Sequence, residues 1–169
     1  MFKLYLFIMV SCISSYVVYV AESPNINKNN TTEIVEKEEQ EIMTLEIPKI
    51  NFIGKIYNKN SKLNDIDKNI IIMNESDMPD KENGILIIGG HSGYGKYAYF
   101  KDLNKLSIDD IVIINYLGNT YTYKVVEYHL DSKDGSISIN NFNKKNKLFL
   151  YTCNPNDKSN YLVYDCERI

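Results

Sequence analysis

The chain lacks tryptophan and is poor in the residues that most often carry chemistry: its 169 residues include two histidines, three cysteines and one arginine. The histidines show no HxxxH or HExxH spacing and the cysteines no CxxC pair, so the sequence predicts no metal site and no other cofactor. The 19 basic and 22 acidic residues leave a net charge of −3 without a basic stripe, which excludes a nucleic-acid-binding surface. A chain of this length holds one core, and one site is expected.

An uncharged, mostly apolar run extends from Leu4 to Ala21, behind a single early cation at Lys3. A run of this length matches a hydrocarbon core of roughly 30 Å at about 1.5 Å per helical residue. We therefore expect residues 1–21 to form a transmembrane anchor, with cleavage near "YVA" or lipidation of Cys12 as alternatives. The lone Lys3 favours a cytoplasmic N-terminus, which would leave the remainder outside the cell, in a single-pass protein of the cell membrane.

The rest of the chain divides into a polar segment and a β-rich segment. Residues 22–43 are rich in Glu and Asn, which predicts a solvated tether. Over residues 44–169, short apolar runs rich in β-branched and aromatic residues alternate with turn residues, a pattern typical of an all-β barrel or sandwich. Eight strands are predicted, at residues 44–50, 52–57, 69–73, 84–90, 110–116, 120–130, 147–153 and 160–166.

Two local patterns add to these strands. The sequence "LGN" at 117–119 is typical of a tight hairpin turn between two strands. Phe100, Leu103 and Leu106 are spaced roughly as on one face of a helix. We therefore expect an all-β domain with one or two short helices, and a short helix or turn at residues 98–106 that packs outside the barrel.

His91 and Cys153 each close an apolar run, so both are expected at the mouth of a strand. His91 follows "GILIIGG" and precedes "SGYGK", and the glycines on both sides permit close backbone approach and unusual dihedral angles. A thiol becomes a nucleophile as the thiolate, which needs a nearby cation or hydrogen-bond donor, and His91 can supply it from a neighbouring strand. Taken singly, a strand-capping histidine and a buried core cysteine explain the two residues equally well.

Two further features are better explained without catalysis. His129 lies on the strand face expected to carry Val125 and Glu127, and is predicted to be a partly exposed strand residue. The segment "GHSGYGK" at 90–96 fits the GxxxxGK pattern of a phosphate loop. Tyr97, however, stands where such a loop has the Ser or Thr that holds magnesium, and no long helix follows.

Cys166 is predicted to be a core residue well along the last strand. On an antiparallel hairpin it would lie toward the opposite end from Cys153, and at about 3.3 Å per residue the separation exceeds the roughly 7 Å limit of a disulfide. A free thiol in an exported protein needs a reason, because paired cysteines outside the cell are normally oxidised. Catalysis at Cys153 supplies that reason.

Three motifs in this order resemble the sortases, cysteine transpeptidases of Gram-positive surfaces: "LEIPKI" at 45–50, "GGHSGYGKYAYFKDLNKL" at 89–106 and "LFLYTCNPN" at 148–156. The resemblance runs from Leu45 to the end of the chain, behind an N-terminal apolar segment. It implies an eight-stranded β-barrel whose His and Cys face each other across a groove. The segment 131–146 lacks the clear helix of one major class, so the chain looks more like class A or D than class B.

The resemblance also implies a reaction. Sortases cleave a short sorting motif of the LPxTG type, hold its acyl part as a thioester and pass it to an amine. Carried over residue by residue, Cys153 would be the nucleophile and His91 the acid and base that serves the leaving and the incoming amine. Thr152 would line the groove and help to hold the peptide or the oxyanion. The implied partners are LPxTG-like signals of surface proteins and an amine from a peptidoglycan precursor or a pilin, and calcium activation stays open.

The chain departs from the family pattern after the cysteine. Sortases carry an arginine at the start of the next strand, where it polarises the scissile carbonyl, and here that position falls on Asn160 or Tyr161. The Asn160 amide could donate to an oxyanion without the charge, and Lys158 in the preceding loop is another candidate donor. The sole arginine, Arg168, is expected at the far end of the barrel, because eight further strand residues at about 3.3 Å each separate it from Asn160.

Two other functions stay open beside a transpeptidase. A sortase-like barrel that has lost activity would only bind peptides or assembly partners, and the missing arginine favours it. A cell-wall cysteine peptidase of the papain-like kind would place its Cys before its His, with the Cys at a helix N-terminus. Here His91 precedes Cys153 and both end predicted strands, which favours the transpeptidase.

Overall fold

The computed structural model describes residues 39–134, 137–139 and 145–169. The expected anchor at 1–21 and most of the expected tether lie outside the described residues. No helix within the described part of the chain is both long and apolar enough to cross a membrane. The described residues form eight strands, as predicted: β1 (Glu41–Ile47), β2 (Phe52–Tyr57), β3 (Ile71–Ile72), β4 (Ile85–Gly89), β5 (Ile111–Tyr116), β6 (Asn119–Ser132), β7 (Lys147–Cys153) and β8 (Asn160–Arg168).

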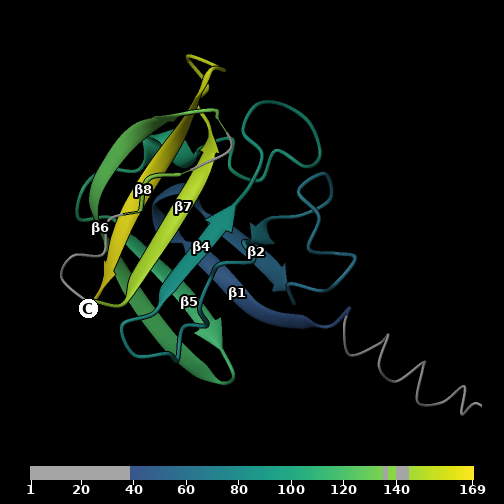
Figure 1. Cartoon of the computed structure of the whole chain (residues 1–169), viewed down its shortest axis with the longest axis vertical. Helices are drawn as coiled ribbons and strands as arrows, with labels where there is room; N and C mark the ends of the chain where they lie inside the picture. Colours follow the sequence, from purple (N-terminus) through teal and green to yellow (C-terminus); the bar gives the residue numbers. More distant parts are fainter. Residues whose placement is uncertain (1–38, 135–136, 140–144) are drawn as a thin grey trace, which may run out of the picture.

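The eight described strands form one sheet in the order β2-β1-β5-β6-β8-β7-β4-β3. The two edge strands, β2 and β3, lie in contact, so the sheet curls into a nearly closed barrel (Figure 1). All recorded strand pairs are antiparallel except β4 with β7, which run parallel. The predicted all-β barrel is therefore confirmed.

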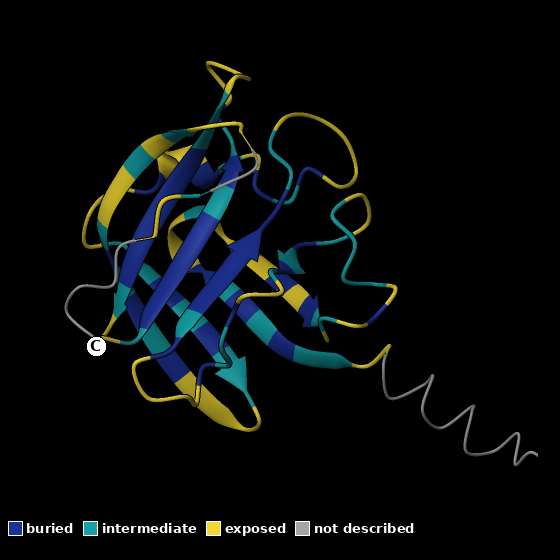
Figure 2. Ribbon diagram, viewed as in Figure 1, coloured by how far each residue is buried: buried dark blue, intermediate teal, exposed yellow. Residues whose placement is uncertain are grey.

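The barrel interior is filled by alternate residues of the strands, because successive side chains of a strand point to opposite faces. Met43, Leu45 and Ile47 of β1 face inward and alternate with less buried residues, whereas β4, β7 and β8 are buried over most of their length (Figure 2). The strand β1 begins at Glu41, inside the segment expected to be tether, and ends at Ile47, where the one-turn 3-10 helix η1 (Pro48–Ile50) replaces the predicted end of the strand.

The segment 98–106 contains a short helix and turns, as predicted, but it does not pack outside the barrel as expected. Only Leu103–Lys105 is helical, as the one-turn 3-10 helix η2. Phe100, Leu103 and Leu106 are all buried in the main core, where Phe100 meets Phe52 edge to face at 5.6 Å between ring centroids. The spacing of these three apolar residues therefore reflects their packing into the main core, and not a helix on the outside of the barrel.

The predicted hairpin turn between β5 and β6 is confirmed. Leu117 and Gly118 both have positive φ, +49° and +78°, and the flanking residues Tyr116 and Asn119 pair with each other. Positive φ at both central residues is the geometry whose twist matches that of the flanking strands. Gly118 adopts it without steric cost, whereas Leu117 does not.

A buried ion pair lies at the start of β7, on the face that points away from the main core. The Lys147 ammonium contacts the Asp165 carboxylate at 2.5 Å, with side-chain exposures of 8% and 5%. Burial raises the pKa of Asp165 above its ordinary value, and the hydrogen bond from Lys147 offsets part of that rise. Lys147 also lies 3.9 Å from Glu167. Removing one partner would leave a buried charge without its counter-ion.

We predict that Asp165→Ala lowers the free energy of unfolding by about 3–5 kcal/mol, because it leaves the buried Lys147 ammonium without this counter-ion. The double variant Lys147→Met with Asp165→Leu should recover most of the loss, since neither charge then needs solvation. Urea unfolding of the full chain measures both. As a matched control, Glu41→Ala removes the acid of an exposed pair with Lys55 and should cost less than about 1 kcal/mol. An equal cost for Glu41 and Asp165 would contradict the role of burial.

Candidate active site

The parallel pairing of β4 with β7 brings the two predicted site residues together. Gly89 pairs with Tyr151, and the Gly90 amide donates to the Tyr151 carbonyl at 3.2 Å. His91 and Cys153 each follow this last pair by two residues, so both lie at the same end of the sheet. A hydrogen bond at 2.7 Å from the Ser92 hydroxyl to the Cys153 carbonyl ties the two chain segments together.

The glycines around His91 serve two different purposes. Gly89 and Gly90 have no space for a side chain, because the Tyr151 ring lies against the first and the Phe100 ring against the second. Gly93 and Gly95 have open space around them but φ values of +96° and +110°, which other residues rarely adopt. The first pair therefore allows close packing beneath His91, and the second pair shapes the loop beyond it.

The carboxylate of Asp67 contacts the imidazole ring of His91. Its carboxylate Oδ1 lies 3.2 Å from His91 Nε2, and the side chains of His91 and Asp67 are 41% and 84% exposed. Asp67 comes from the segment between β2 and β3, far from His91 in the sequence. A carboxylate at this position orients the imidazole ring and favours a proton on Nε2. Sequence reasoning missed Asp67, because no short-range spacing links it to His91.

Cys153 lies on the outer face of the sheet, away from the main core. Alternation along β7 places it on the same face as Tyr151, and on β8 its direct partner is Tyr161. Ahead of the thiol, this face carries a band of apolar side chains that we call the apolar shelf. The shelf consists of the buried Ile87, Phe149 and Val163, with the partly buried Met73, Ile85, Ile137, Tyr151 and Tyr161 packed against them. A peptide laid along β7 would meet this shelf before reaching Cys153.

Thr152 lies elsewhere than the sequence led us to expect. Its side chain is 2% exposed, and its hydroxyl donates to the Gly90 carbonyl at 2.7 Å. The residue therefore points toward the barrel interior and does not line the outer face beside Cys153. Its hydrogen bond holds the end of β7 to the end of β4, which positions His91 and Cys153 relative to each other.

Tyr161, and not Asn160, lies opposite the thiol. Tyr161 pairs directly with Cys153, whereas Asn160 is the preceding residue of β8 and so points to the other face. The Asn160 amide is bound within the β7–β8 loop, donating to Asp157 Oδ2 at 2.7 Å and to the Ser159 hydroxyl at 3.3 Å. Of the two positions left open in the sequence, Tyr161 is thus the one that shares a sheet face with the thiol.

Lys133 was not singled out from the sequence, yet it lies beside the thiol. It directly follows β6, and its ammonium is 5.3 Å from the centroid of the Tyr161 ring. A hydrogen bond to Cys153, reinforced by charge attraction, raises the pKa of Lys133 above its ordinary value. The sequence carries no spacing signal for this contact, because it depends on how β6 pairs with β8.

Arg168 and Cys166 lie where the sequence placed them, whereas His129 does not share a strand face with Val125 as expected, because the pairing of β6 with β8 shifts between Val125 and Glu127. Arg168 pairs with Tyr123 at the other end of β8, with its guanidinium 4.5 Å from the centroid of the Tyr121 ring. Cys166 is fully buried, and burial raises the pKa of its thiol. Both cysteines within the described residues are free thiols. His129 is partly exposed, with its Nε2 3.4 Å from Asp131 Oδ2.

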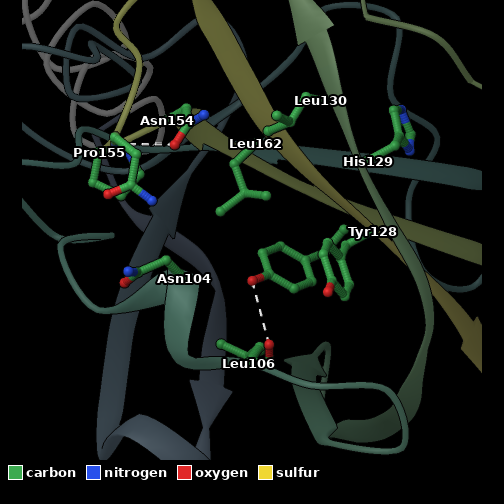
Figure 3. Close-up of a pocket in the computed structure, with 10 residues that line it drawn as sticks. Asn104, Leu106, Tyr128, His129, Leu130, Asn154, Pro155 and Leu162 are labelled. Carbon is green, nitrogen blue, oxygen red and sulfur yellow. Dashed lines mark hydrogen bonds between the residues drawn. The ribbon is translucent and has the colours of Figure 1, made fainter.

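A pocket of about 460 Å³ lies beside the β7–β8 loop, immediately after Cys153 (Figure 3). Leu130 and Leu162, which pair with each other, line it from β6 and β8, and Asn104 and Leu106 close it from the side of η2. Tyr164 also lines the pocket, and its hydroxyl donates a hydrogen bond to the Leu106 carbonyl at 3.4 Å. Alternation puts Leu162 on the opposite face of β8 from Tyr161, so the pocket and the thiol open on different faces of the sheet.

The barrel and its site can now be compared with known proteins. The sequence matches the Sortase domain model over residues 45–167. Sortase D of Bacillus subtilis (strain 168) is 29% identical over 125 residues, which amount to 71% of this chain and 60% of that protein. The chain thus spans about three fifths of the length of this curated relative.

Several solved structures share the fold. Sortase A from Corynebacterium diphtheriae, as a lid mutant, has a TM-score of 0.67 at 21% identity and covers 90% of this chain and 82% of its own. A sortase D5 transpeptidase from Clostridium perfringens has a TM-score of 0.65 at 22% identity, and the match covers 86% of this chain and 90% of that one. Sortase C1 from Streptococcus agalactiae has a TM-score of 0.65 at 24% identity, and the match covers 82% of this chain and 76% of that one. At these identities the similarity shows a shared fold. Because the domain model covers most of the chain, the chain belongs to the sortase family, whose members are cysteine transpeptidases.

Proposed function

We propose that the protein is a membrane-anchored transpeptidase that cleaves LPxTG-like sorting signals and transfers them to an amine. The observation that supports this most is the parallel β4–β7 pairing, after which His91 and Cys153 follow at one end of the sheet, next to an apolar shelf. The expected anchor at 1–21 would hold the barrel outside the cell. The amine would come from a peptidoglycan precursor or a pilin, as the family resemblance implies.

The geometry supports a two-step acyl transfer. The Cys153 thiolate attacks the carbonyl carbon of the scissile peptide, and a tetrahedral intermediate forms. When the carbon–nitrogen bond breaks, His91 gives a proton to the leaving amine, and a thioester remains on Cys153. An incoming amine then attacks the thioester, His91 accepts its proton, and the thiolate is released. The apolar residues of the motif would lie on the apolar shelf, where their burial supplies binding energy.

The site is less compatible with the other two functions. A papain-like peptidase places its cysteine at a helix N-terminus, whereas Cys153 is the last residue of β7. A barrel that only binds peptides would not need a thiol and an imidazole at the same end of two neighbouring strands. The absence of an arginine from the start of β8 is the one observation that favours the binder, so the test below includes that outcome.

The first prediction concerns the covalent intermediate. Incubated with a panel of LPxTG-type peptides and an amine, with and without calcium, the full chain should form an acyl adduct on Cys153 that mass spectrometry detects. Cys153→Ala should abolish the adduct, and His91→Ala should lower kcat/KM by at least about 100-fold, in the range of lost acid–base catalysis. Cys166→Ala, which removes the other described thiol from the core, should retain the adduct. Peptide binding without any adduct across the panel would identify a binder.

The second prediction concerns Asp67, which would position His91. Asp67→Asn should reduce kcat/KM by about 5-fold or less, because an exposed ion pair is worth about 1 kcal/mol at most. Asp109→Asn makes the same change in charge at an exposed pair with Lys124 and should leave kcat/KM unchanged. Steady-state assays at several ionic strengths should show the Asp67 effect shrinking as salt screens the pair. A salt-independent loss would contradict an electrostatic role.

A further inference from the structure

We propose that Lys133 is a catalytic residue of this site, whose ammonium pairs with the Cys153 thiolate and donates to the oxyanion formed during acyl transfer. The proposal rests on the transpeptidase function proposed above and assigns to a lysine the charge that sortases take from an arginine. That lysine comes from a different element, the chain just beyond β6, and not from β8.

The strand register brings Lys133 to the thiol. On one side of β8, Tyr161 pairs with Cys153, and on the other side it pairs with Asp131. Directly paired residues share a face, and so do residues two apart on one strand, so Cys153, Tyr161, Asp131 and the next odd position, Lys133, share the outer face. The Lys133 amide donates to the Ser159 carbonyl at 3.0 Å, which continues this pairing by one more step.

Side-chain contacts then direct the ammonium toward the sulfur. The Lys133 ammonium lies over the Tyr161 ring at 5.3 Å, within the range of a cation–π contact. The Tyr161 ring in turn meets Tyr151 edge to face at 5.8 Å, which fixes its position beside the strand that carries Cys153. Attraction to Cys153, by hydrogen bonding and by charge, raises the pKa of Lys133, which agrees with an ammonium directed toward this residue.

The other candidate donors are less well placed. The Asn160 amide is bound to Asp157 and Ser159 within the loop. Arg168 lies at the opposite end of β8 from the thiol. Lys158 is an exposed residue of the β7–β8 turn, between Asp157 and Ser159. Lys133 is therefore the cation that the geometry assigns to the thiol.

The chemistry requires no proton from Lys133. As the Cys153 sulfur bonds to the carbonyl carbon, the carbonyl π pair moves to oxygen, and negative charge passes from sulfur to oxygen. An ammonium within reach of both atoms stabilises the thiolate first and the oxyanion next. The pair of electrons returns to carbon when the amine leaves, with its proton supplied by His91. Lys133 stays protonated throughout.

The first test measures the thiolate directly and needs no peptide substrate. The rate of iodoacetamide alkylation at Cys153 is followed against pH in the full chain, in Lys133→Gln and in Lys133→Arg. Other titratable groups on this side of the site are His91, Asp67, Tyr151, Tyr161 and Asp131, and they are unchanged in all three proteins. Lys133→Gln should slow alkylation at pH 7 by about 3- to 10-fold, and Lys133→Arg should keep most of the rate.

The second test measures turnover with the peptide that gives the adduct. Lys133→Gln should lower kcat/KM by about 10- to 100-fold, at the lower end of losing an oxyanion donor because the lysine is exposed. Lys133→Arg should stay within about 10-fold of the native chain. Adding Tyr161→Arg to Lys133→Gln places a cation on β8 opposite Cys153 and should restore part of the lost rate. Lys158→Gln, an equal change of charge in the adjacent turn, should change neither alkylation nor turnover.

The outcomes separate the two proposals. If Lys133→Gln, shown by thermal unfolding to be as stable as the native chain, leaves alkylation and turnover unchanged, Lys133 has no catalytic role. Loss in Lys158→Gln instead of Lys133→Gln also overturns the assignment, as does slowed alkylation with normal turnover. If no peptide reacts with the native chain while Lys133→Gln still slows alkylation, the peptide chemistry is overturned and the pairing of Lys133 with the thiolate stands.

Discussion

The parallel pairing of β4 with β7 is the constraint on which the site depends. If β4 and β7 were antiparallel, their C-terminal ends would lie at opposite ends of the barrel. Because they are parallel, both C-terminal ends lie at the same end. The pairing is held beyond the ladder by the buried Thr152 hydroxyl on the Gly90 carbonyl and by the Ser92 hydroxyl on the Cys153 carbonyl. These bonds tie the last residues of both strands, where regular pairing alone would fray. The two strand ends are therefore held by backbone pairing and by these two hydroxyls, and not by the side chains of His91 and Cys153.

Local patterns in the sequence were enough to predict the strands, because each strand carries its own apolar run between turn residues. The bounds of β2 and β7 agree with those expected, and β3 and β4 are only shortened. His91 and Cys153 were predicted as strand-end residues for the same reason. The segment 98–106 was misjudged because a 3.6-residue apolar spacing also suits an irregular plug that packs several side chains into one core.

The composition of the site beyond these two residues could not be predicted, because it depends on register. Between Val125 and Glu127, β6 contains an irregularity that shifts its pairing with β8 by one residue. A one-residue shift exchanges the two faces of a strand. Before it, Val125 points into the core; after it, the odd-numbered residues point outward. His129 therefore does not share a face with Val125, and Lys133 lies on the face of Cys153.

Lys147 and Lys133, both on the outer face, show how burial decides what a charge can do. Lys147 is buried with Asp165 at the start of β7, where low dielectric makes the pair strongly dependent on both partners, so it is confined to a structural role. Lys133, near the other end, is exposed and is held by an aromatic face and a thiol. A cation held in this way keeps hydrogen-bonding capacity for an oxyanion. Opposite Cys153, the start of β8 carries the Tyr161 ring in place of an arginine, and this ring is the surface on which the Lys133 ammonium packs from beyond β6.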